Sequence, residues 1–413
     1  MIPERADFAV IGTGPSGCMS AGLLAKAGFD VVMLERDVHP RNTVGENMIP
    51  DFWKFTDMIG ASEDIKKAGF VTKRGGRVHW DGQVERLAFR DFGYERPGLH
   101  VDRDEFDSIL VRHAQRLGAR LFENVTVRKV DFGEERQSVR YDTADGPGQI
   151  SVRYVIDASG QGGLLARQLG TRVTNPDFRF MAFWGYFENS RYYDYDGVSY
   201  PHSMIQDVPC VTTQVSLTEG DHIGWAWHIP LRKSTSVGCV LLRETVVKLK
   251  QNFDNWEDRF EHLVGNEPVL QHLLENATLI DRKFHFINNF SGHSAQIAGP
   301  GFFQVGDAAG FFDPIFSIGV TLGLYSGSLA AWFAAECVRK PQNVARYQTY
   351  FNRQMLGRIE LARGIALPHY ASSPLQEDRA SQTLRFTSDN GMDLLKSAAK
   401  MPKRASNLDR LLI

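Results

Sequence analysis

The chain has 413 residues, of which 43% are hydrophobic and 23% charged, a balance typical of a globular protein with a large core. Its 47 Lys and Arg and 49 Asp and Glu residues leave a formal net charge of −2, so we expect no nucleic-acid partner, because such binding requires a basic excess. The four cysteines are too few for a disulfide framework and form no CxxC or Cys/His cluster, so we expect no metal site and a cytoplasmic protein.

The first elements predict a nucleotide-binding βαβ unit. A buried strand is expected at residues 6–11, a glycine-rich turn at 12–17, a helix to about residue 27 and a second strand at 31–34. The glycines would permit a tight turn and close approach of the backbone to a pyrophosphate at the helix N-terminus. Glu35 would accept a hydrogen bond from a ribose, whereas Arg36 is a cofactor contact or a solvated surface charge. The predicted contacts, which suit FAD or NAD, are Gly12, Gly14, Pro15, Ser16, Gly17, Glu35 and Arg36.

Two later segments favour FAD over NAD. Residues 155–160 and 305–310 each end a strand-like apolar run on a turn of small residues. With the first unit, they resemble the fingerprints of flavoproteins that have the p-hydroxybenzoate hydroxylase fold. This resemblance implies that Asp307 binds the ribityl chain of FAD and that Arg103 reaches the flavin. Taken singly, each segment is more often an ordinary turn or surface pair.

These segments lie apart in the chain and predict an α/β protein. We expect a discontinuous, Rossmann-like FAD-binding domain formed by residues 1–46, 95–172 and 280–340. Residues 47–94 and 173–279 would form an interleaved β-sheet substrate region, whose aromatic content suits the wall of a cavity. Residues 341–413 are expected to form a helical C-terminal region.

Residues 225–230 carry the most specific motif in the chain. Their sequence, Trp-Ala-Trp-His-Ile-Pro, matches the WxWxIP motif of flavin-dependent halogenases, and residues 45–47 with 68–76 resemble the segment that carries the active-site lysine of that family. The resemblance covers about residues 6–340 and assigns the lysine to Lys73, with Glu46 near the lysine and the flavin. On spacing alone, core tryptophans and a surface lysine would be the better interpretation. The motif residues are Trp225, Trp227, Ile229 and Pro230.

The resemblance implies that halide oxidation and transfer of the halogen to the substrate take place at different residues. Halide oxidised at the flavin would give hypohalous acid, which is small enough to pass along a tunnel. Bulky tryptophans would prevent the organic substrate from entering that tunnel. Lys73 would then meet the acid, either as an ammonium that orients it by a hydrogen bond or as a neutral amine that forms a haloamine. Burial lowers the pKa of a lysine and makes either route feasible.

Residues 314–335 contain no formal charge over 22 residues, long enough in principle to cross a bilayer. Polar and small residues dilute this stretch, so we expect a buried helix rather than a membrane span. Gly319, Gly323 and Gly327 would let that helix approach neighbouring backbone or flavin closely. Its start resembles the helix start that lies beside the flavin ring in the halogenase family, where backbone amides favour anions.

The resemblance places a halide at the amides of Ile318 and Gly319 with Ser317 as the remaining hydroxyl, but two departures matter. Tryptophan halogenases carry a glutamate where this chain has Phe316, which fits the phenol and pyrrole branches instead. Those branches usually have a hydroxyl residue at the place of Ile318. Its loss puts the halide preference, and halide use itself, in question.

The sequence therefore predicts an FAD-dependent halogenase that receives reduced FAD from a separate flavin reductase and uses O₂ with chloride or bromide. The acceptor would be an electron-rich aromatic such as a pyrrole, phenol or indole, either free or tethered to an acyl or peptidyl carrier protein. The cationic residues of 396–410 would meet such a carrier or form a solvated tail. The alternatives are a flavin-dependent monooxygenase or oxidase that has lost halide use, a membrane-associated prenyl-lipid reductase, and a nonenzymatic flavin-binding module.

Overall fold

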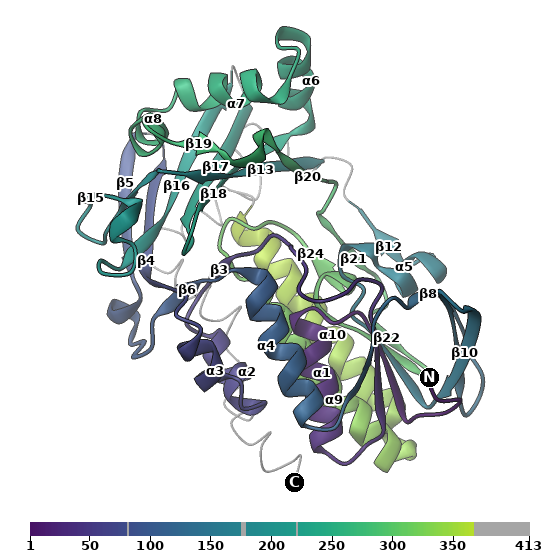
Figure 1. The fold of residues 1–413 in the computed structure, drawn as a ribbon. Coiled ribbons are helices and arrows are strands. Elements are labelled where there is room, and N and C mark those ends of the chain that lie inside the picture. Colours follow the sequence, from purple (N-terminus) through teal and green to yellow (C-terminus); the bar gives the residue numbers. More distant parts are fainter. Residues whose placement is uncertain (81, 175–178, 220–221, 367–413) are drawn as a thin grey trace.

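The computed structural model describes residues 1–80, 82–174, 179–219 and 222–366. A mostly parallel sheet forms one half of the fold (Figure 1). Its central strand pairs in parallel with a strand on either side, in the register Phe8↔Val31 and Phe8↔Tyr154. The strands at Phe8–Ile11 and Val31–Leu34 are buried along their whole length, as strands covered on both faces are. The strand order is β22 (Ala298–Gly299), β23 (Phe302–Gln304), β11 (Tyr154–Asp157), β1 (Phe8–Ile11), β2 (Val31–Leu34) and β7 (Arg120–Phe122).

Four long helices lie beside this sheet: α1 (Pro15–Lys26), α4 (Arg103–Arg116), α9 (Gly319–Arg339) and α10 (Val344–Ala366) (Figure 1). The glycines of α9 let it pack tightly on α1. A Cβ atom on Gly327 would lie 2.4 Å from the carbonyl oxygen of Ser16, and Ser20 donates a hydrogen bond to the carbonyl of Gly327 at 3.0 Å. The uncharged stretch thus forms a helix whose small residues meet another backbone.

None of the described helices combines the length and the hydropathy that crossing a bilayer requires.

A ten-stranded sheet forms the second half of the fold, with α6 (Arg243–Asn252), α7 (Trp256–Gly265) and α8 (Pro268–Leu274) along its outer side (Figure 1). Strand β4 joins its two parts, because it pairs in parallel with β16 and antiparallel with β5 and β6. The strand order is β19 (Thr278–Leu279), β13 (Phe180–Glu188), β18 (Thr235–Leu242), β17 (His222–Pro230), β16 (Cys210–Glu219), β4 (Val71–Trp80), β6 (Gly98–His100) and β3 (Asn47–Met48), with β20 (His285–Asn288) on β13 and β5 (Gln83–Ala88) on β4.

In the described chain, three smaller sheets and three short α-helices accompany the two large sheets. The predicted α/β class is confirmed. The smaller sheets are β8 (Thr126–Asp131), β9 (Gln137–Thr143) and β10 (Gly146–Val152), then β12 (Arg172–Val173), β21 (Gly292–Ser294) and β24 (Gly310–Phe311), and the pair β14 (Arg191–Tyr193) and β15 (Ser199–Pro201). The short helices are α2 (Phe52–Met58), α3 (Ser62–Lys67) and α5 (Leu164–Gln168).

The large sheet extends beyond the segments predicted for the substrate region. Strands β6 and β20 lie in ranges that the sequence analysis gave to the cofactor domain, yet both pair within the ten-stranded sheet. At the C-terminal end, α10 lies within the predicted helical region. The cationic residues proposed to meet a carrier protein, Lys396, Lys400, Lys403, Arg404 and Arg410, lie outside the described residues.

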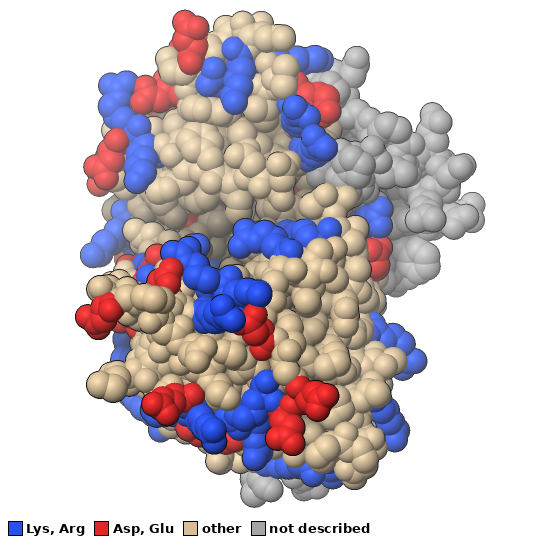
Figure 2. Space-filling view, turned by 90° about the vertical axis from the view of Figure 1, so that its right-hand side faces the viewer, with Lys and Arg blue, Asp and Glu red and all other residues tan. Residues whose placement is uncertain are grey.

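The face seen in Figure 2 carries charges of both signs. Lys and Arg side chains gather across its middle, below a hollow, and Asp and Glu side chains lie among and beneath them. This mixture on one face accords with the small formal net charge of −2.

Candidate active site

The glycine-rich turn between β1 and α1 has the geometry that a phosphate group requires. Gly12 has a φ of +91°, and a Cβ atom there would lie 2.4 Å from the carbonyl oxygen of Ala158. A Cβ atom on Gly17 would lie 2.1 Å from the carbonyl oxygen of Gly12, so both positions admit only glycine. Gly14 precedes α1, and a Cβ atom there would meet only the guanidinium of Arg41, at 3.6 Å. The turn therefore fits the pyrophosphate of a dinucleotide, with open space at Gly14 and with Pro15 and Ser16 beginning the helix.

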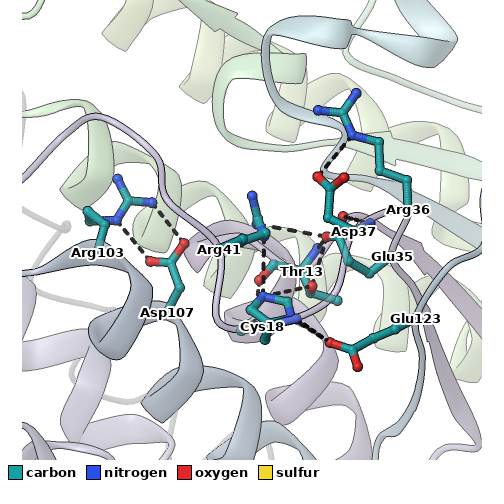
Figure 3. A network of polar contacts seen from close by, with 10 residues as sticks. Thr13, Cys18, Glu35, Arg36, Asp37, Arg41, Arg103, Asp107 and Glu123 are labelled. Carbon is teal, nitrogen blue, oxygen red and sulfur yellow. Dashed lines mark hydrogen bonds and ion pairs between the residues drawn. The ribbon is translucent and has the colours of Figure 1, made fainter. Parts of the chain in front are cut away.

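Glu35 follows β2 and is held by the same turn (Figure 3). Its Oε2 accepts hydrogen bonds from the backbone amide and the hydroxyl of Thr13, both at 2.8 Å. Burial would raise the pKa of this carboxyl, but Arg41 and the Thr13 amide outweigh burial and lower the pKa. The resulting carboxylate has further lone pairs that can accept from a ribose hydroxyl. Arg36 is 73% exposed and pairs with Asp37 at 3.2 Å, on the side away from the turn (Figure 3).

Arg41 is a residue that the sequence analysis missed. Its Nη2 lies 3.8 Å from Glu35 Oε2, and its Nε donates to the ring of His39 at 3.3 Å. His39 in turn donates from its ring Nδ1 to Glu123 at 2.9 Å. The guanidinium therefore lies beside Gly14, where a pyrophosphate would carry its charge. A basic residue shortly after the acid that ends the second strand is the signal that could have identified it.

Arg103 and Asp307 occupy different environments. Arg103 donates to both carboxylate oxygens of Asp107, at 2.9 and 3.0 Å, and from Nη1 to the carbonyl of Val44 at 2.8 Å. It therefore supports the loop that leads to Glu46. Asp307 accepts a hydrogen bond from Gln161 Nε2 at 3.0 Å, and burial raises the pKa of its carboxyl. Gln161, the hydrogen-bond partner of Asp307, is a second residue of the site, after Arg41, that the sequence analysis did not identify.

A first cavity lies between Asp307, the start of α9 and the side of α10. Gly306 and Asp307 border it on one side and Ile318 and Gly319 on another. Asp307, the predicted ribityl contact, and Ile318 and Gly319 of the predicted halide turn thus line one cavity. The full lining is Gly306, Asp307, Gly310, Phe311, Phe312, Asp313, Ile318, Gly319, Leu322, Gly323, Ser326, Met355, Arg358, Ile359 and Ala362.

Lys73 lines a second cavity and is 4% exposed. Burial lowers the pKa of its ammonium to about 7, so amine and ammonium coexist near neutral pH. Its Nζ donates to Asn47 Oδ1 at 2.5 Å and lies 5.1 Å from the centre of the Phe89 ring. On β6 its direct partner is Gly98, which has no side chain to occupy the space that the lysine uses.

Asn47 connects Lys73 to the turn before α9. Its Nδ2 donates to Ser317 Oγ at 2.6 Å. Ser317 has a φ of +57°, a left-handed conformation that is uncommon for a residue other than glycine. The structure thus joins two predicted residues, Lys73 and Ser317, through a third that the sequence analysis did not single out.

Glu46, the neighbour of Asn47, lies elsewhere. Its carboxylate accepts from the hydroxyl of Tyr186 at 2.9 Å and from the amide of Gly45 at 3.0 Å. Burial raises the pKa of Glu46. Within the described chain it does not line the cavity of Lys73, because adjacent residues of an extended segment point to opposite sides.

Trp225 and Trp227 lie two residues apart on β17 and share one face of the sheet. Their ring centres are 5.8 Å apart, and Trp227 donates from Nε1 to Ser236 at 3.1 Å. Among the described residues, neither tryptophan lines either cavity; both pack in one buried cluster with Ile229, Phe312 and Ile315. The tryptophans therefore support the turn before α9 instead of bordering the open space. Pro230 ends the strand, and its carbonyl accepts from His100 Nδ1 at 3.0 Å.

Ile318 is the one lining residue of the described chain that belongs to both cavities. Phe316 and Ser317 line only the cavity of Lys73, whereas Gly319 lines only the cavity of Asp307. The two cavities therefore meet at Ile318. The full lining of the second cavity is Asn47, Ile49, Pro50, Asp51, Lys73, Gly76, Val78, Leu87, Phe89, Tyr94, Thr212, Gln214, Ile315, Phe316, Ser317 and Ile318.

Comparisons with known proteins agree on one family. Residues 7–99 and 95–408 match the family model described as tryptophan halogenase. The chain is 30% identical to a tryptophan 2-halogenase of Chondromyces crocatus over 87% of its own length, and 34% identical to a flavin-dependent halogenase of Armillaria mellea over 82%. It spans 66% of the length of each of these two relatives.

A solved structure resembles almost the whole chain. The myxobacterial chondrochloren halogenase, described as a variant of FAD-dependent halogenases, is 26% identical and superposes with a TM-score of 0.80 over 99% of this chain and 96% of its own.

Proposed function

From the premise that the chain belongs to the flavin-dependent halogenases, within the tryptophan halogenase family, we propose that it halogenates an electron-rich aromatic acceptor. It would use reduced FAD from a separate flavin reductase, O₂, and chloride or bromide. The observation that carries this proposal is Lys73, a buried amine with a pKa near 7. Its cavity is also lined by Ser317 and Ile318 of the predicted halide turn, and it shares Ile318 with the cavity of Asp307.

The chain's own residues divide the binding work. The turn from Gly12 to Gly17, with Arg41 and Glu35, would hold the pyrophosphate and ribose of FAD, and Asp307 would bind its ribityl chain. When bound, reduced FAD supplies with O₂ the oxidising equivalents that turn halide into hypohalous acid. The amides at the start of α9 have no partners within the helix and would hold the halide.

Lys73 would act as a neutral amine. Its nitrogen takes the halogen from hypohalous acid, HOX, with release of water and formation of the haloamine –NHX. A carbon of the aromatic ring then attacks that halogen, and the ring proton goes to the nitrogen, which restores the amine. Asn47 would orient the nitrogen, because its Oδ1 accepts a hydrogen bond from Nζ at 2.5 Å.

The cavity around Lys73 suits a phenol or a pyrrole. Most of its wall is apolar, and Phe89 and Phe316 can contact an aromatic ring. Asp51 lies in the same wall, is fully buried, and accepts hydrogen bonds from Tyr94 and, at 2.5 Å, from Lys54. Such a carboxylate would bind a phenol hydroxyl or a pyrrole N–H. Phe316 also supports the phenol and pyrrole branches over an enzyme that uses a paired lysine and glutamate.

The test is an assay with a flavin reductase, FAD, O₂ and either halide on a panel of free and carrier-bound aromatics. We expect products with halogen isotope patterns in mass spectrometry, and no product when halide or reductase is left out. Oxygen insertion without halide dependence would replace this proposal with the monooxygenase alternative. Rapid NAD(P)H oxidation by the pure protein alone would contradict the need for a separate reductase.

A further inference from the structure

Cys210 lies beside Lys73 in the large sheet. The two residues are direct partners in the parallel pair of β16 and β4, so their side chains leave the sheet on the same face. Cys210 is fully buried and Lys73 is 4% exposed. Burial raises the pKa of the thiol to about 12, and the nearby Lys73 charge lowers it only in part. A neutral thiol and a titrating amine therefore lie on neighbouring strands on one buried face of the sheet.

His100 holds the sulfur but cannot remove its proton. The ring Nδ1 lies 3.0 Å from the carbonyl oxygen of Pro230, which can only accept, so Nδ1 carries the hydrogen. Nε2 then accepts from the hydroxyl of Thr212 at 2.8 Å. Cys210 Sγ lies 3.3 Å from the same Nδ1. With both ring nitrogens engaged, Lys73 is the base left to receive the thiol proton.

The lysine stands between the cavity and the cysteine. Lys73 lines the second cavity, and in the described chain Cys210 does not. An oxidant that enters the cavity would therefore meet the amine first. Only a halogen already on Lys73 would be presented to the sulfur.

We propose that Cys210 is a second halogen acceptor, and that Lys73 and Cys210 become joined by a sulfenamide bond when no aromatic acceptor occupies the cavity. The proposal rests on the proposed function for its oxidant, hypohalous acid. The bond would occupy the Lys73 nitrogen and stop halogenation until a thiol reductant cleaves it. The protein would thus carry a modification site that halts an unproductive oxidation.

The chemistry balances without a further oxidant. Hypohalous acid and the amine give the haloamine and water. The sulfur takes the halogen as the thiol proton moves to nitrogen, which leaves a sulfenyl halide and a free amine. The nitrogen then attacks sulfur and expels halide, and its proton leaves with the halide as HX. Two molecules of an external thiol restore Cys210 and Lys73 and end as a disulfide.

The decisive experiment uses the whole purified protein and added hypobromous acid, so that no catalysis is needed. The oxidant is titrated until the peptide of Lys73 or of Cys210 is consumed, and digests are compared by mass spectrometry. We expect a peptide pair joined through these residues, lighter than the sum of its parts by two hydrogen atoms, that separates on treatment with dithiothreitol. Separate oxidation of either residue without this link would overturn the proposal.

Two variants serve as controls. Cys210→Ser should form no link, whereas Cys239→Ser should form it as the wild type does. Cys239 is equally buried in the same sheet, but its direct partners are Phe183 and Ala226. If Cys210→Ser fails to fold, the linked or unlinked peptides of the wild type alone decide the proposal. A link that persists in folded Cys210→Ser would assign the bond to another sulfur and reject the proposal.

A second arm separates this inference from the proposed function. The protein is incubated with reductase, FAD, O₂ and bromide but no acceptor, and then assayed with and without dithiothreitol. We expect loss of most halogenation and recovery by the reductant, together with the same linked peptides. If the link forms with added hypobromous acid but not with the reductase, FAD, O₂ and bromide, the protein does not make the oxidant and the proposed function is contradicted. If the link forms in neither arm, the role of Cys210 is contradicted.

Discussion

Asn47 accepts a hydrogen bond from Lys73 at 2.5 Å, although the two residues belong to strands separated by β6. The amide nitrogen of Asn47 donates to Ser317 at the same time. Lys73 is therefore aligned with the turn before α9 through one side chain, which can be changed without touching the amine.

Replacing Asn47 with alanine should slow halogenation about tenfold while release of hypohalous acid to a small trap continues. The loss of the hydrogen bond that orients the neutral amine, on the order of 1.4 kcal/mol, corresponds to that factor. Asn47→Asp is the matched variant. Its carboxylate would stabilise the ammonium of Lys73 and raise the pKa of Lys73, so activity should rise at a higher pH than in the wild type. Equal pH profiles for Asn47→Asp and the wild type would contradict direct contact during catalysis.

Lys73→Ala should abolish product halogenation while flavin reoxidation and hypohalous acid release continue. The oxidant would form on the Asp307 side of Ile318, whereas Lys73 acts in the other cavity. Product mass spectrometry and a small chemical trap measure the two steps separately. Normal halogenation by this variant would remove the lysine from the mechanism.

Halogenation by the wild type should rise with pH through about 7, because the neutral form of Lys73 would be the nucleophile and burial lowers its pKa to that value. The measurement is the rate of product formation at saturating acceptor, with the supply of reduced FAD held constant. A rate that falls with rising pH would instead favour the ammonium as the species that orients hypohalous acid.

Lys73→Met should stabilise the fold at pH 6, by up to about 5 kcal/mol, because the folded wild type must bury an ammonium. The folded pKa of about 7 lies below the usual value of 10.5, so the unfolded chain binds more protons between these values. Wild-type stability therefore rises with pH across that window, and the advantage of the methionine shrinks toward its upper end. Denaturant unfolding at several pH values measures this, and a pH-independent difference would contradict a buried charge.

Gly14→Val should fold but lose most FAD affinity. A Cβ atom at Gly14 meets only Arg41 within the protein, so the branched side chain would instead fill the approach to the pyrophosphate. Gly357→Ala on α10 is the control, because a Cβ atom there has no neighbour within 4 Å, and it should keep FAD. Fluorescence titration with FAD distinguishes them, and full binding by Gly14→Val would show that the turn has another role.

Ile318→Ser should raise the use of chloride relative to bromide, which we expect the wild type to prefer because bromide is easier to oxidise. A hydroxyl at this position would add a hydrogen-bond donor to the proposed halide amides. The ratio of chlorinated to brominated product, with both halides present, measures the change. An unchanged ratio would place halide selection elsewhere.

Local elements of the site were predictable from the sequence, whereas its long-range contacts were not. The strand, turn, helix and strand around Gly12 follow from neighbouring residues, and the glycine spacing of α9 predicted its close packing. The bridge from Lys73 through Asn47 to Ser317 joins three distant segments, and no local pattern marks Asn47. The resemblance to halogenases, confirmed by the family model, led to Lys73. The tunnel that it implies at Trp225 and Trp227 stays a prediction, and both side chains lie in a buried cluster on one strand face.

The position of Ile318 has a consequence for how such a protein can diversify. Because the two cavities share one lining residue in the described chain, substitutions on β4, β5 or β16 can reshape the proposed acceptor cavity while the other residues that line the cavity of Asp307 stay the same. The residues that line the two cavities can then mutate independently of each other. Descendants of this chain could then take new acceptors, under the proposed function, while keeping the cavity of Asp307 unchanged.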